Sequence, residues 1–527
     1  MAFLQMFFYN CDSTYHIIGR ETKTMKKRMA LLLAVFMLLP MFAACGGEKT
    51  PAVTTASSEE TVVTKDPNTP DIPTPEEIGD ISGEFKILVA GNYAFNDFKS
   101  EGEEGTAVDT AIYRRNAYLK DKYNIDITYD EILGFMRING SGEGYMKIAQ
   151  DHMAGNHTYD AASIGTWDVA TLAYSGYIHD LNDKEAMKYI DLTKPYWDQR
   201  ANADLMIRNK MYYTTGDISL VDNMSTNAIL FNKGMRAAYG LEDPYELVRS
   251  GDWTLEKFIE LARAVGEDAN QDGIYDENDV YGLMTWNDAT LAVLAAAGEK
   301  ICSIDENGDL ELTFYNERVV NLFDTFAGLY FDYAHTFNYQ YSTQAGEARP
   351  SAAWDTNRTK MFDSNQALFY FTTLITVSRH RDSETDFGIL PFPKFDKSQE
   401  RYGHVISDYA GQYICVPEMT GDFARAGLVL EELAYQGQKV LTPAYYDQTL
   451  IGQYTRDEES TEMLDIIFSS RVYDVGMYYK IGNYRDSLIS YSRTHASLSS
   501  IYDTALNAAN KKIDTINIFF NQLNAAD

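Results

Sequence analysis

The sequence predicts an α/β protein in which a doubly wound, mostly parallel sheet is flanked by helices. Strand and helix patterns alternate along residues 84–91, 110–123, 125–129, 144–155 and 159–165, and this alternation is typical of parallel sheets with helices on both faces. Roughly 480 residues follow the N-terminal segments, more than one hydrophobic core usually supports. We therefore expect two lobes.

Each element has its own local signal. Residues 84–91 (EFKILVAG) form a short apolar run that ends at glycine, and residues 125–129 (IDITY) alternate as a strand does. Within 110–123, apolar residues recur at the spacing of one helix face, and the same periodicity marks residues 488–519. The loop expected at 165–168 follows the third strand, at the sheet edge where such folds bind ligands.

Charge limits the possible partners. The chain has 45 basic and 77 acidic residues, a formal net charge of −32. Such a surface repels phosphate backbones and anionic lipid, so nucleic acid is not expected as a partner. Aromatic residues are abundant, with 38 Tyr and 26 Phe, which suits either an aromatic core or a carbohydrate or peptide groove.

Residues 25–47 resemble the signal sequence of a bacterial lipoprotein. Three basic residues precede the apolar run 29–44, which is shorter than the roughly 20 residues of a membrane-spanning helix. Small residues then precede Cys45, as in a lipobox, although Phe42 stands where Leu is usual. The resemblance implies a signal peptide at 25–44, acylation of Cys45 and an extracytoplasmic, lipid-anchored protein. An ordinary cleaved signal or an anchor helix is the alternative.

The segments on either side of this signal are not expected to fold. Residues 1–24 precede a second methionine that starts a complete signal sequence, so we interpret them as a mis-assigned start. Residues 45–81 are rich in Thr, Ser, Pro and acidic residues and predict a disordered tether. Beyond it, Cys302 and Cys415 either pair or remain buried thiols.

A series of short motifs resembles extracellular solute-binding proteins of ABC importers, of the family 1 type that includes maltose- and oligosaccharide-binding proteins. The motifs occur in the order of that family and are YDAAS at 159–163, WD at 167–168, AYSGYIHDL at 173–181, NKMYY at 209–213, AILFNK at 228–233, DWTLEK at 252–257 and DFGILPFP at 386–393. The resemblance implies a two-lobe periplasmic-binding-protein-like fold. Lobe one would comprise 82–220 plus 391–440, and lobe two 221–390 plus 441–527 with C-terminal helices.

The same resemblance implies a function. The chain would be a monomeric receptor that binds a solute between its lobes, preferably an oligosaccharide, and delivers it to ABC permease subunits. A peptide or a modified sugar is the next choice of solute. Because metalloprotease, nucleophile-elbow, phosphate-loop and Cys-x-x-Cys motifs are absent from the sequence, we do not expect an enzyme. The competing hypotheses are a secreted carbohydrate-active enzyme and a surface adhesin without transport.

Two tryptophans with polar neighbours are the main candidates for the ligand groove. A Trp face stacks on a sugar ring while an adjacent Asp or Asn binds hydroxyl groups, and a packing role is the alternative for each. Loops and strand ends that resemble ligand-facing positions of the family add further candidates, although Arg379 could belong to a solvated basic turn. The full set is Trp167, Asp168, Trp286, Asn287, Thr373, Arg379, Asp408 and Tyr409.

Residues 268–279 (DANQDGIYDEND) predict a structural calcium site. Oxygen-bearing side chains stand at loop positions 1, 3, 5, 9 and 12, and Gly273 stands at position 6, where such loops turn sharply. Position 12 is Asp where the EF-hand has Glu. The expected ligands are Asp268, Asn270, Asp272, Ile274 through its carbonyl, Asp276 and Asp279. A metal-free acidic turn is the alternative.

Overall fold

The computed structural model describes residues 67–93, 95–134, 142–340, 358–380, 382–446 and 458–526. The chain divides into two compact units, Met1–Lys65 and Asp66–Asp527, and every described residue belongs to the second. The predicted start at 1–24, the signal peptide at 25–44, Cys45 and the tether up to 66 lie outside the described residues. From 67 on, the predicted tether contains a one-turn helix, α2 (Pro75–Ile78).

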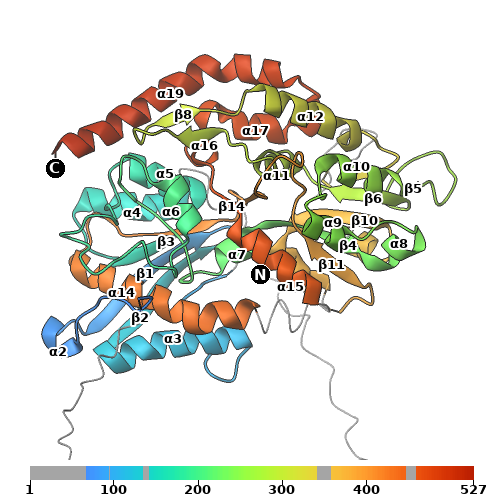
Figure 1. Ribbon diagram of the computed structural model, residues 1–527. Coiled ribbons are helices and arrows are strands. Elements are labelled where there is room, and N and C mark those ends of the chain that lie inside the picture. Colours follow the sequence, from blue (N-terminus) through green and yellow to red (C-terminus); the bar gives the residue numbers. More distant parts are fainter. Residues whose placement is uncertain are drawn as a thin grey trace, which may run out of the picture. The chain divides into compact units, whose positions relative to one another are not determined.

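The first sheet has the strand order β13-β3-β1-β2. β1 pairs in parallel with both β2 and β3, whereas β13 is antiparallel to β3. The helices between the first three strands are crossover connections that join parallel strands. This arrangement confirms the predicted doubly wound α/β class (Figure 1). The bounds are β1 (Gly83–Gly91), α3 (Ala107–Tyr123), β2 (Ile125–Leu133), α4 (Glu143–Ala154), β3 (Ala161–Gly165), α5 (Thr166–Tyr174), α6 (Gln199–Leu205) and β13 (Gln412–Cys415).

Capping moves the start of α3 ahead of the predicted residue 110. Thr106 Oγ1 accepts from the backbone N–H of Asp109 at 3.2 Å, and Asp109 Oδ2 accepts from the N–H of Thr106 at 3.0 Å. This reciprocal capping box satisfies two N–H groups that the helix itself cannot pair. At the other end Asn124 adopts a left-handed conformation, with φ of 53°, and ends the helix.

The second sheet contains β11, β4, β10, β6 and β5 in that order, with β9 beside β6. β10 is parallel to β6 and antiparallel to β4. Gly282 in β6 is required by packing, since a Cβ there would lie 1.7 Å from the carbonyl oxygen of Ala262. The bounds are α7 (Val221–Ser225), β4 (Asn227–Asn232), α8 (Lys233–Ala238), α9 (Pro244–Ser250), α10 (Leu255–Arg263), β5 (Gly266–Glu267), β6 (Val280–Thr285), α11 (Ala289–Ala296), β9 (Thr336–Asn338), β10 (Ala367–Thr373), the 3₁₀ helix η1 (Leu374–His380) and β11 (Phe387–Leu390).

A buried polar cluster holds the chain where it leaves the first sheet for the second. Arg115 of α3 donates from Nη1 to the carbonyl of Ile218 at 2.8 Å and from Nη2 to the carbonyl of Asp97. The Asp97 carboxylate accepts from Ser219 Oγ at 2.7 Å and from the N–H of Leu220 at 2.6 Å. Burial raises the pKa of Asp97 to about 6 against these hydrogen bonds. Residues 218–220 are thereby fixed to α3.

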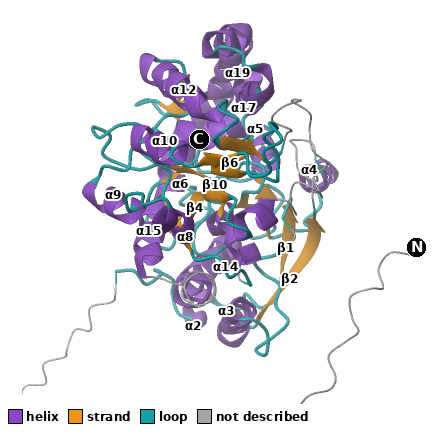
Figure 2. Ribbon diagram, turned by 90° about the vertical axis from the view of Figure 1, so that its right-hand side faces the viewer, coloured by secondary structure: helices purple, strands orange, loops and turns teal. Residues whose placement is uncertain are grey.

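The C-terminal helices pack against helices and strands that lie near both sheets. In both views α19 lies close to α12 and α17 (Figures 1 and 2), and it also contacts β8 and α5. Asn517 of α19 hydrogen-bonds both backbone groups of Leu310. The remaining bounds are β7 (Cys302–Ile304), β8 (Leu310–Leu312), α12 (Glu317–Tyr330), β12 (His404–Val405), α14 (Phe423–Gln436), the π-helix η2 (Gly437–Leu441), α15 (Glu458–Ser469), β14 (Arg471–Val472), α16 (Val475–Tyr478), the 3₁₀ helix η4 (Ile481–Asn483), α17 (Tyr484–Ile489), α18 (Tyr491–Thr494) and α19 (Leu498–Ala526).

Two further features of the fold are the state of its cysteines and the character of its helices. Cys302 and Cys415 are both buried, free thiols. Among the described helices, none combines the length and the apolar character needed to cross a membrane.

Glu431 on α14 should make the stability of this fold depend on pH. It is fully buried and accepts from Trp197 Nε1 at 2.8 Å, from the N–H of Asp191 at 3.2 Å and from the Tyr196 hydroxyl. Burial raises its pKa to about 7. Because the folded state then binds this proton more tightly than the unfolded state does, stability is full below the unfolded pKa and is lost as pH rises through about 7.

We expect Glu431→Gln to raise the free energy of unfolding at pH 8 by roughly 2–4 kcal/mol, since one pKa unit corresponds to about 1.4 kcal/mol. It should also flatten the stability profile between pH 5 and 8. The measurement is urea unfolding at several pH values. Glu432→Gln is the control, because Glu432 pairs with Lys122 at 2.7 Å and its loss should destabilise the fold. A profile as steep in Glu431→Gln as in the unmutated protein would contradict this assignment.

Candidate functional site

The carboxyl ends of β1 and β3 form one wall of the site, together with the start of β13. Gln412 of β13 pairs in register with Gly165, the last residue of β3. Its side chain lies over Gly91, the last residue of β1, where a Cβ would approach Gln412 Cδ to 2.3 Å. Gln412 is only 2% exposed, and both polar atoms of its amide find no hydrogen-bond partner among the described residues. A buried amide in this state is suited to bind a polar group from outside the protein.

Trp167 lies next to this wall, on the first turn of α5. The sequence predicted a loop at 165–168, and this prediction is wrong, because α5 begins directly at Thr166. Trp167 is 9% exposed, and its Nε1 donates to Asp408 Oδ2 at 3.1 Å. Asp168 is fully buried and accepts from the backbone N–H groups of Gly142 and Tyr145 at 3.3 and 3.2 Å. Its carboxylate therefore stabilises the positive end of α4.

Asp408 also binds Arg485, which comes from the C-terminal helices. Arg485 donates from Nε to Asp408 Oδ2 at 2.8 Å and from Nη2 to Oδ1 at 3.1 Å, so the pair is bidentate. The guanidinium carbon lies 4.9 Å from the Trp167 ring centroid, and Lys480 Nζ lies 4.8 Å from it. Two cations thus interact with one indole ring, whose π face attracts positive charge.

The second sheet contributes Trp286, which follows β6. Its ring stacks on Tyr339, with centroids 6.4 Å apart and planes at 14°. Asn287 donates from its backbone to Gln340 Oε1 at 2.7 Å, and its side-chain oxygen accepts from Asn338 at 3.1 Å. These contacts fix the turn between β6 and α11 and support one face of the Trp286 ring.

The two sheets meet at a small cavity. Asn227, Trp286, Asp288, Ser407 and Asp408 are among the residues that line it. Its volume is about 10 Å³, room for about one water molecule. The Asn227 side-chain oxygen is buried and has no hydrogen-bond partner among the described residues. A sugar ring enters this junction only if the two sides separate.

Burial and neighbouring charges shift the pKa values of groups at the junction. Burial raises the pKa of Asp288 to about 6; the Arg485 charge opposes this rise, while the Asp408 and Asp486 carboxylates add to it. Nearby, Tyr93 follows β1 and lies close to Thr373 at the end of β10, so the two sheets approach each other here. Burial raises the pKa of Tyr93, and the positive charges of Arg358 and Arg379 lower it.

The structure thus brings together several of the predicted residues. Trp167, Trp286 and Asp408 meet at the junction, and Thr373 and Arg379 lie around Tyr93. Tyr409 places its ring edge-on to Trp167 with centroids 6.5 Å apart, and its carbonyl accepts from Asn92. The buried carboxylate of Asp168 and the side chain of Asn287 are instead engaged with neighbouring backbone and side chains.

Sequence reasoning missed Tyr93, Asn227, Asp288, Gln412, Lys480 and Arg485. Tyr93 follows a predicted strand and could have been found by applying the rule of strand ends to β1 as well as to β3. Arg485 and Lys480 lie in the C-terminal segment, where only helical periodicity was recognised. The sequence carries no local signal that would bring them to Trp167.

The loop 268–279 turns as predicted at Gly273, whose φ is 78°. Asp268 Oδ2 accepts from the N–H of Gly273 at 2.9 Å, while Asp268 Oδ1 is buried without a hydrogen-bond partner among the described residues. Asp279 accepts from the N–H groups of Ala269 and Asp276 at 2.9 and 2.8 Å. Within the described residues, there is no group of three or more His, Cys, Asp or Glu side chains that could hold a metal ion.

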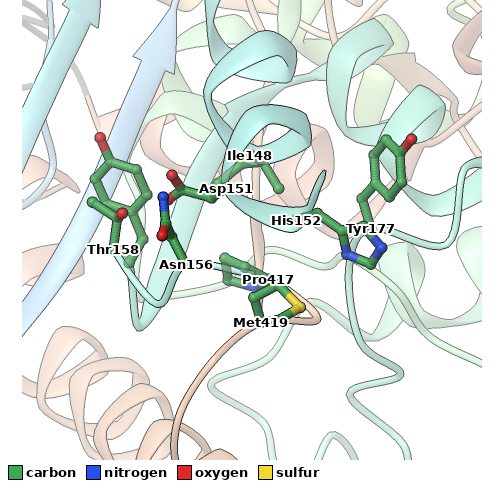
Figure 3. Close-up of a pocket in the computed structure, with 9 residues that line it drawn as sticks. Ile148, Asp151, His152, Asn156, Thr158, Tyr177, Pro417 and Met419 are labelled. Atoms are coloured by element: carbon green, nitrogen blue, oxygen red, sulfur yellow. The ribbon is translucent and has the colours of Figure 1, made fainter. Parts of the chain in front are cut away.

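A second small cavity lies in the first lobe, beside α4 and β3. Figure 3 shows Asp151 and Asn156 on one side of it and His152 next to Tyr177 on the other, with Pro417 and Met419 below. The His152 and Tyr177 ring centroids are 4.5 Å apart. The cavity measures about 10 Å³, so it is the size of one water molecule and too small for a sugar.

Comparisons with known proteins agree with this geometry. No protein-family profile matches the chain, and no curated protein sequence matches it. Solved structures that match include an ABC substrate-binding protein from Listeria monocytogenes in complex with cycloalternan, with 14% identity over 84% of this chain and 99% of the other and a TM-score of 0.51. The GacH receptor of Streptomyces glaucescens, solved unliganded and with acarbose, matches with 14% identity over 82% and 99% and a TM-score of 0.52.

A third structure is the galacto-N-biose/lacto-N-biose I-binding protein of the ABC transporter from Bifidobacterium longum, solved with lacto-N-biose. It shares 12% identity over 83% of this chain and 98% of its own, with a TM-score of 0.53. The described part of the chain therefore has the two-lobed fold of ABC-transporter solute-binding proteins. This confirms the fold that the sequence motifs implied. Two of these neighbours are binding proteins and one is a receptor.

We expect the Asp408–Arg485 pair to link the two lobes energetically. Asp408→Asn and Arg485→Met should each lower the free energy of unfolding by about 3–5 kcal/mol, because each removes one member of a largely buried, bidentate ion pair. The double variant should lose less than the sum of the two. Urea unfolding of all four proteins gives the coupling energy. The control is Asp486→Asn, whose exposed ion pair with Arg485 should contribute less than about 1 kcal/mol. Strict additivity would show that the pair is not coupled.

Proposed function

We propose that this protein is an extracytoplasmic receptor of an ABC importer that binds an oligosaccharide between its two lobes and delivers it to the permease. The observation that carries the proposal is the junction itself. Trp167 from the first lobe and Trp286 from the second both lie at Asp408, one through a hydrogen bond and the other across a shared cavity. Aromatic rings beside hydrogen-bonding groups are the features that sugar sites combine.

Binding in this geometry requires the lobes to move. The cavity holds about one water molecule, and the Trp167 ring already interacts with Lys480 and Arg485. A sugar that reaches Trp167 must therefore displace a cation, and it gains contacts with both lobes only when they close again. Ligand-driven closure of two domains follows from this difference in contacts between the open and closed states.

The proposal extends to the N-terminal segments. Acylation of Cys45 would attach the receptor to the outer face of the membrane, and a diacylglycerol supplies the two chains that stable anchoring needs. The folded part would act as a monomer on its tether. A peptide or a modified sugar is the alternative solute, and the competing activities are glycan cleavage and adhesion.

Calcium binding to residues 268–279 is part of the proposal. The buried, unpartnered Asp268 Oδ1 supports it, since a buried carboxylate oxygen needs a hydrogen-bond donor or a cation. Each Asp279 oxygen accepts one N–H and keeps a further lone pair for a metal ion. Asn270, Asp272, Asp276 and the Ile274 carbonyl would complete an oxygen cage around this hard cation. The ion would brace the second lobe and take no part in catalysis.

We expect Trp286→Ala and Trp167→Ala each to weaken solute binding by about 1–3 kcal/mol, the contribution of one buried aromatic contact. A glycan and peptide array identifies the solute, and calorimetry measures the loss. Tyr239→Ala is the control, because this Tyr is exposed on the second lobe. Unchanged affinity together with a large loss of ligand-free stability would show that these are packing residues. Release of reducing ends at enzymatic turnover would contradict the receptor function.

We expect calcium to raise the melting temperature of chelator-treated protein, because a ligand that binds only the folded state stabilises it. Asp268→Ala combined with Asp272→Ala should abolish this rise. Glu277→Gln removes a charge from the same loop at a position without a ligand role and should leave it intact. The measurement is thermal unfolding with and without calcium. An equal rise in the double variant would contradict a site in this loop.

A further inference from the structure

A further pocket, of about 260 Å³ and larger than the two cavities described above, lies between α5 and the C-terminal helices. Thr171 and Tyr174 line it from α5, Tyr479 and Lys480 from the turn that follows α16, and Lys512 from α19. This volume is just below the about 300–1,000 Å³ of pockets for drug-sized ligands. The pocket therefore has the size for a single sugar unit or an inorganic ion.

The charge of this pocket is opposite to that of the chain. The sequence has 77 acidic and 45 basic residues, yet both charged side chains that line the pocket are lysines. Lys512 Nζ lies 4.4 Å from the Tyr174 ring centroid, and no charge of a described carboxylate contributes to its pKa. Burial lowers the pKa of Lys512. A half-buried ammonium group without a carboxylate partner favours an anion from outside.

Lys480 connects this pocket with the solute site. Its backbone adopts a left-handed conformation, with φ of 53°, which is uncommon for a residue other than glycine. Its Nζ lies over the Trp167 ring, which belongs to the first turn of α5. Thr171 and Tyr174 lie one and two turns further along the same helix. The pocket and the lobe junction are therefore neighbours that share one lysine. The carboxylates of Asp486, Asp168 and Asp408 act on the charge of Lys480, so Lys512 is the main anion-binding group of the pocket.

We propose that this pocket binds a small anion, a carboxylate, sulfate or phosphate group held by Lys480 and Lys512. The Tyr174 ring would form an apolar wall for any ring attached to that group. Two sources share this chemistry, a free inorganic anion and the acidic group of a saccharide. Only the saccharide form rests on the proposed receptor function, in which case the solute is an acidic sugar.

The first experiment is calorimetry on the full chain at constant ionic strength, with sulfate, phosphate and glucuronate as probes and glucose as the neutral control. We expect anions to bind and glucose not to bind. Lys512→Met, which keeps most of the apolar stem, should weaken anion binding at least tenfold. Lys511→Met is the matched control, because Lys511 is the adjacent, exposed residue of the same helix. Binding that is equal in Lys512→Met and the unmutated protein would overturn the proposal.

The probes also separate the two sources. Glucuronate that binds more tightly than sulfate and phosphate identifies a sugar acid, and equal affinities identify an inorganic anion. Either result supports anion binding in this pocket. Absence of binding by all three anions overturns it. Because these probes report on the pocket alone, failure of neutral oligosaccharides to bind the lobe junction would contradict the receptor function and leave the anion pocket standing.

A second measurement needs no variant and so does not depend on folding. An amine-acylating reagent is applied with and without the anion, and modification of each lysine is followed by mass spectrometry. We expect the anion to slow modification of Lys512 and Lys480 severalfold and to leave Lys511 unaffected. Protection of none of these lysines under saturating anion would place the bound anion elsewhere and overturn the proposal.

Discussion

The ion pair between Asp408 and Arg485 is the interaction on which the arrangement of the site depends. It joins a loop that precedes β13 to the C-terminal helices, and the same carboxylate accepts the Trp167 N–H. Both side chains are largely shielded from water, so the pair needs good geometry to compensate for desolvation. The bidentate contact supplies that geometry. Three segments that are remote in sequence are thereby held around one indole ring.

Buried polar groups recur where the chain passes between the two sheets. Asp97 and Arg115 bind the backbone of Ile218 and Leu220 and the hydroxyl of Ser219, and Tyr93 lies close to Thr373 at the junction. Such contacts cost desolvation and stabilise less than apolar packing of the same size. They do, however, fix the relative orientation of the groups that they join, because hydrogen bonds tolerate only a narrow range of distances and angles. These contacts therefore hold the segments that join the two sheets in one defined arrangement.

The two candidate binding regions differ in their electrostatics. At the lobe junction, the carboxylates of Asp288, Asp408 and Asp486 lie near the cations Arg485 and Lys480, so charges of both signs are present there. The pocket beside α19 is lined by two lysines and by no described carboxylate. Because Lys480 contributes to both, a ligand with a neutral part and an acidic part could use both at once.

The sequence by itself determined the α/β class, the alternation of strands and helices in the first lobe and the turn at Gly273. These features follow from local patterns, namely hydrophobic period, capping and turn residues. It did not determine that residue 166 starts a helix, that Asp168 caps α4, or that Gln412, Lys480 and Arg485 join the site. Only the tertiary structure decided these, because the side-chain contacts join residues from 23 (Tyr145 and Asp168) to 321 (Gly91 and Gln412) positions apart. Such contacts depend on how the elements pack, and local spacing carries no record of that packing.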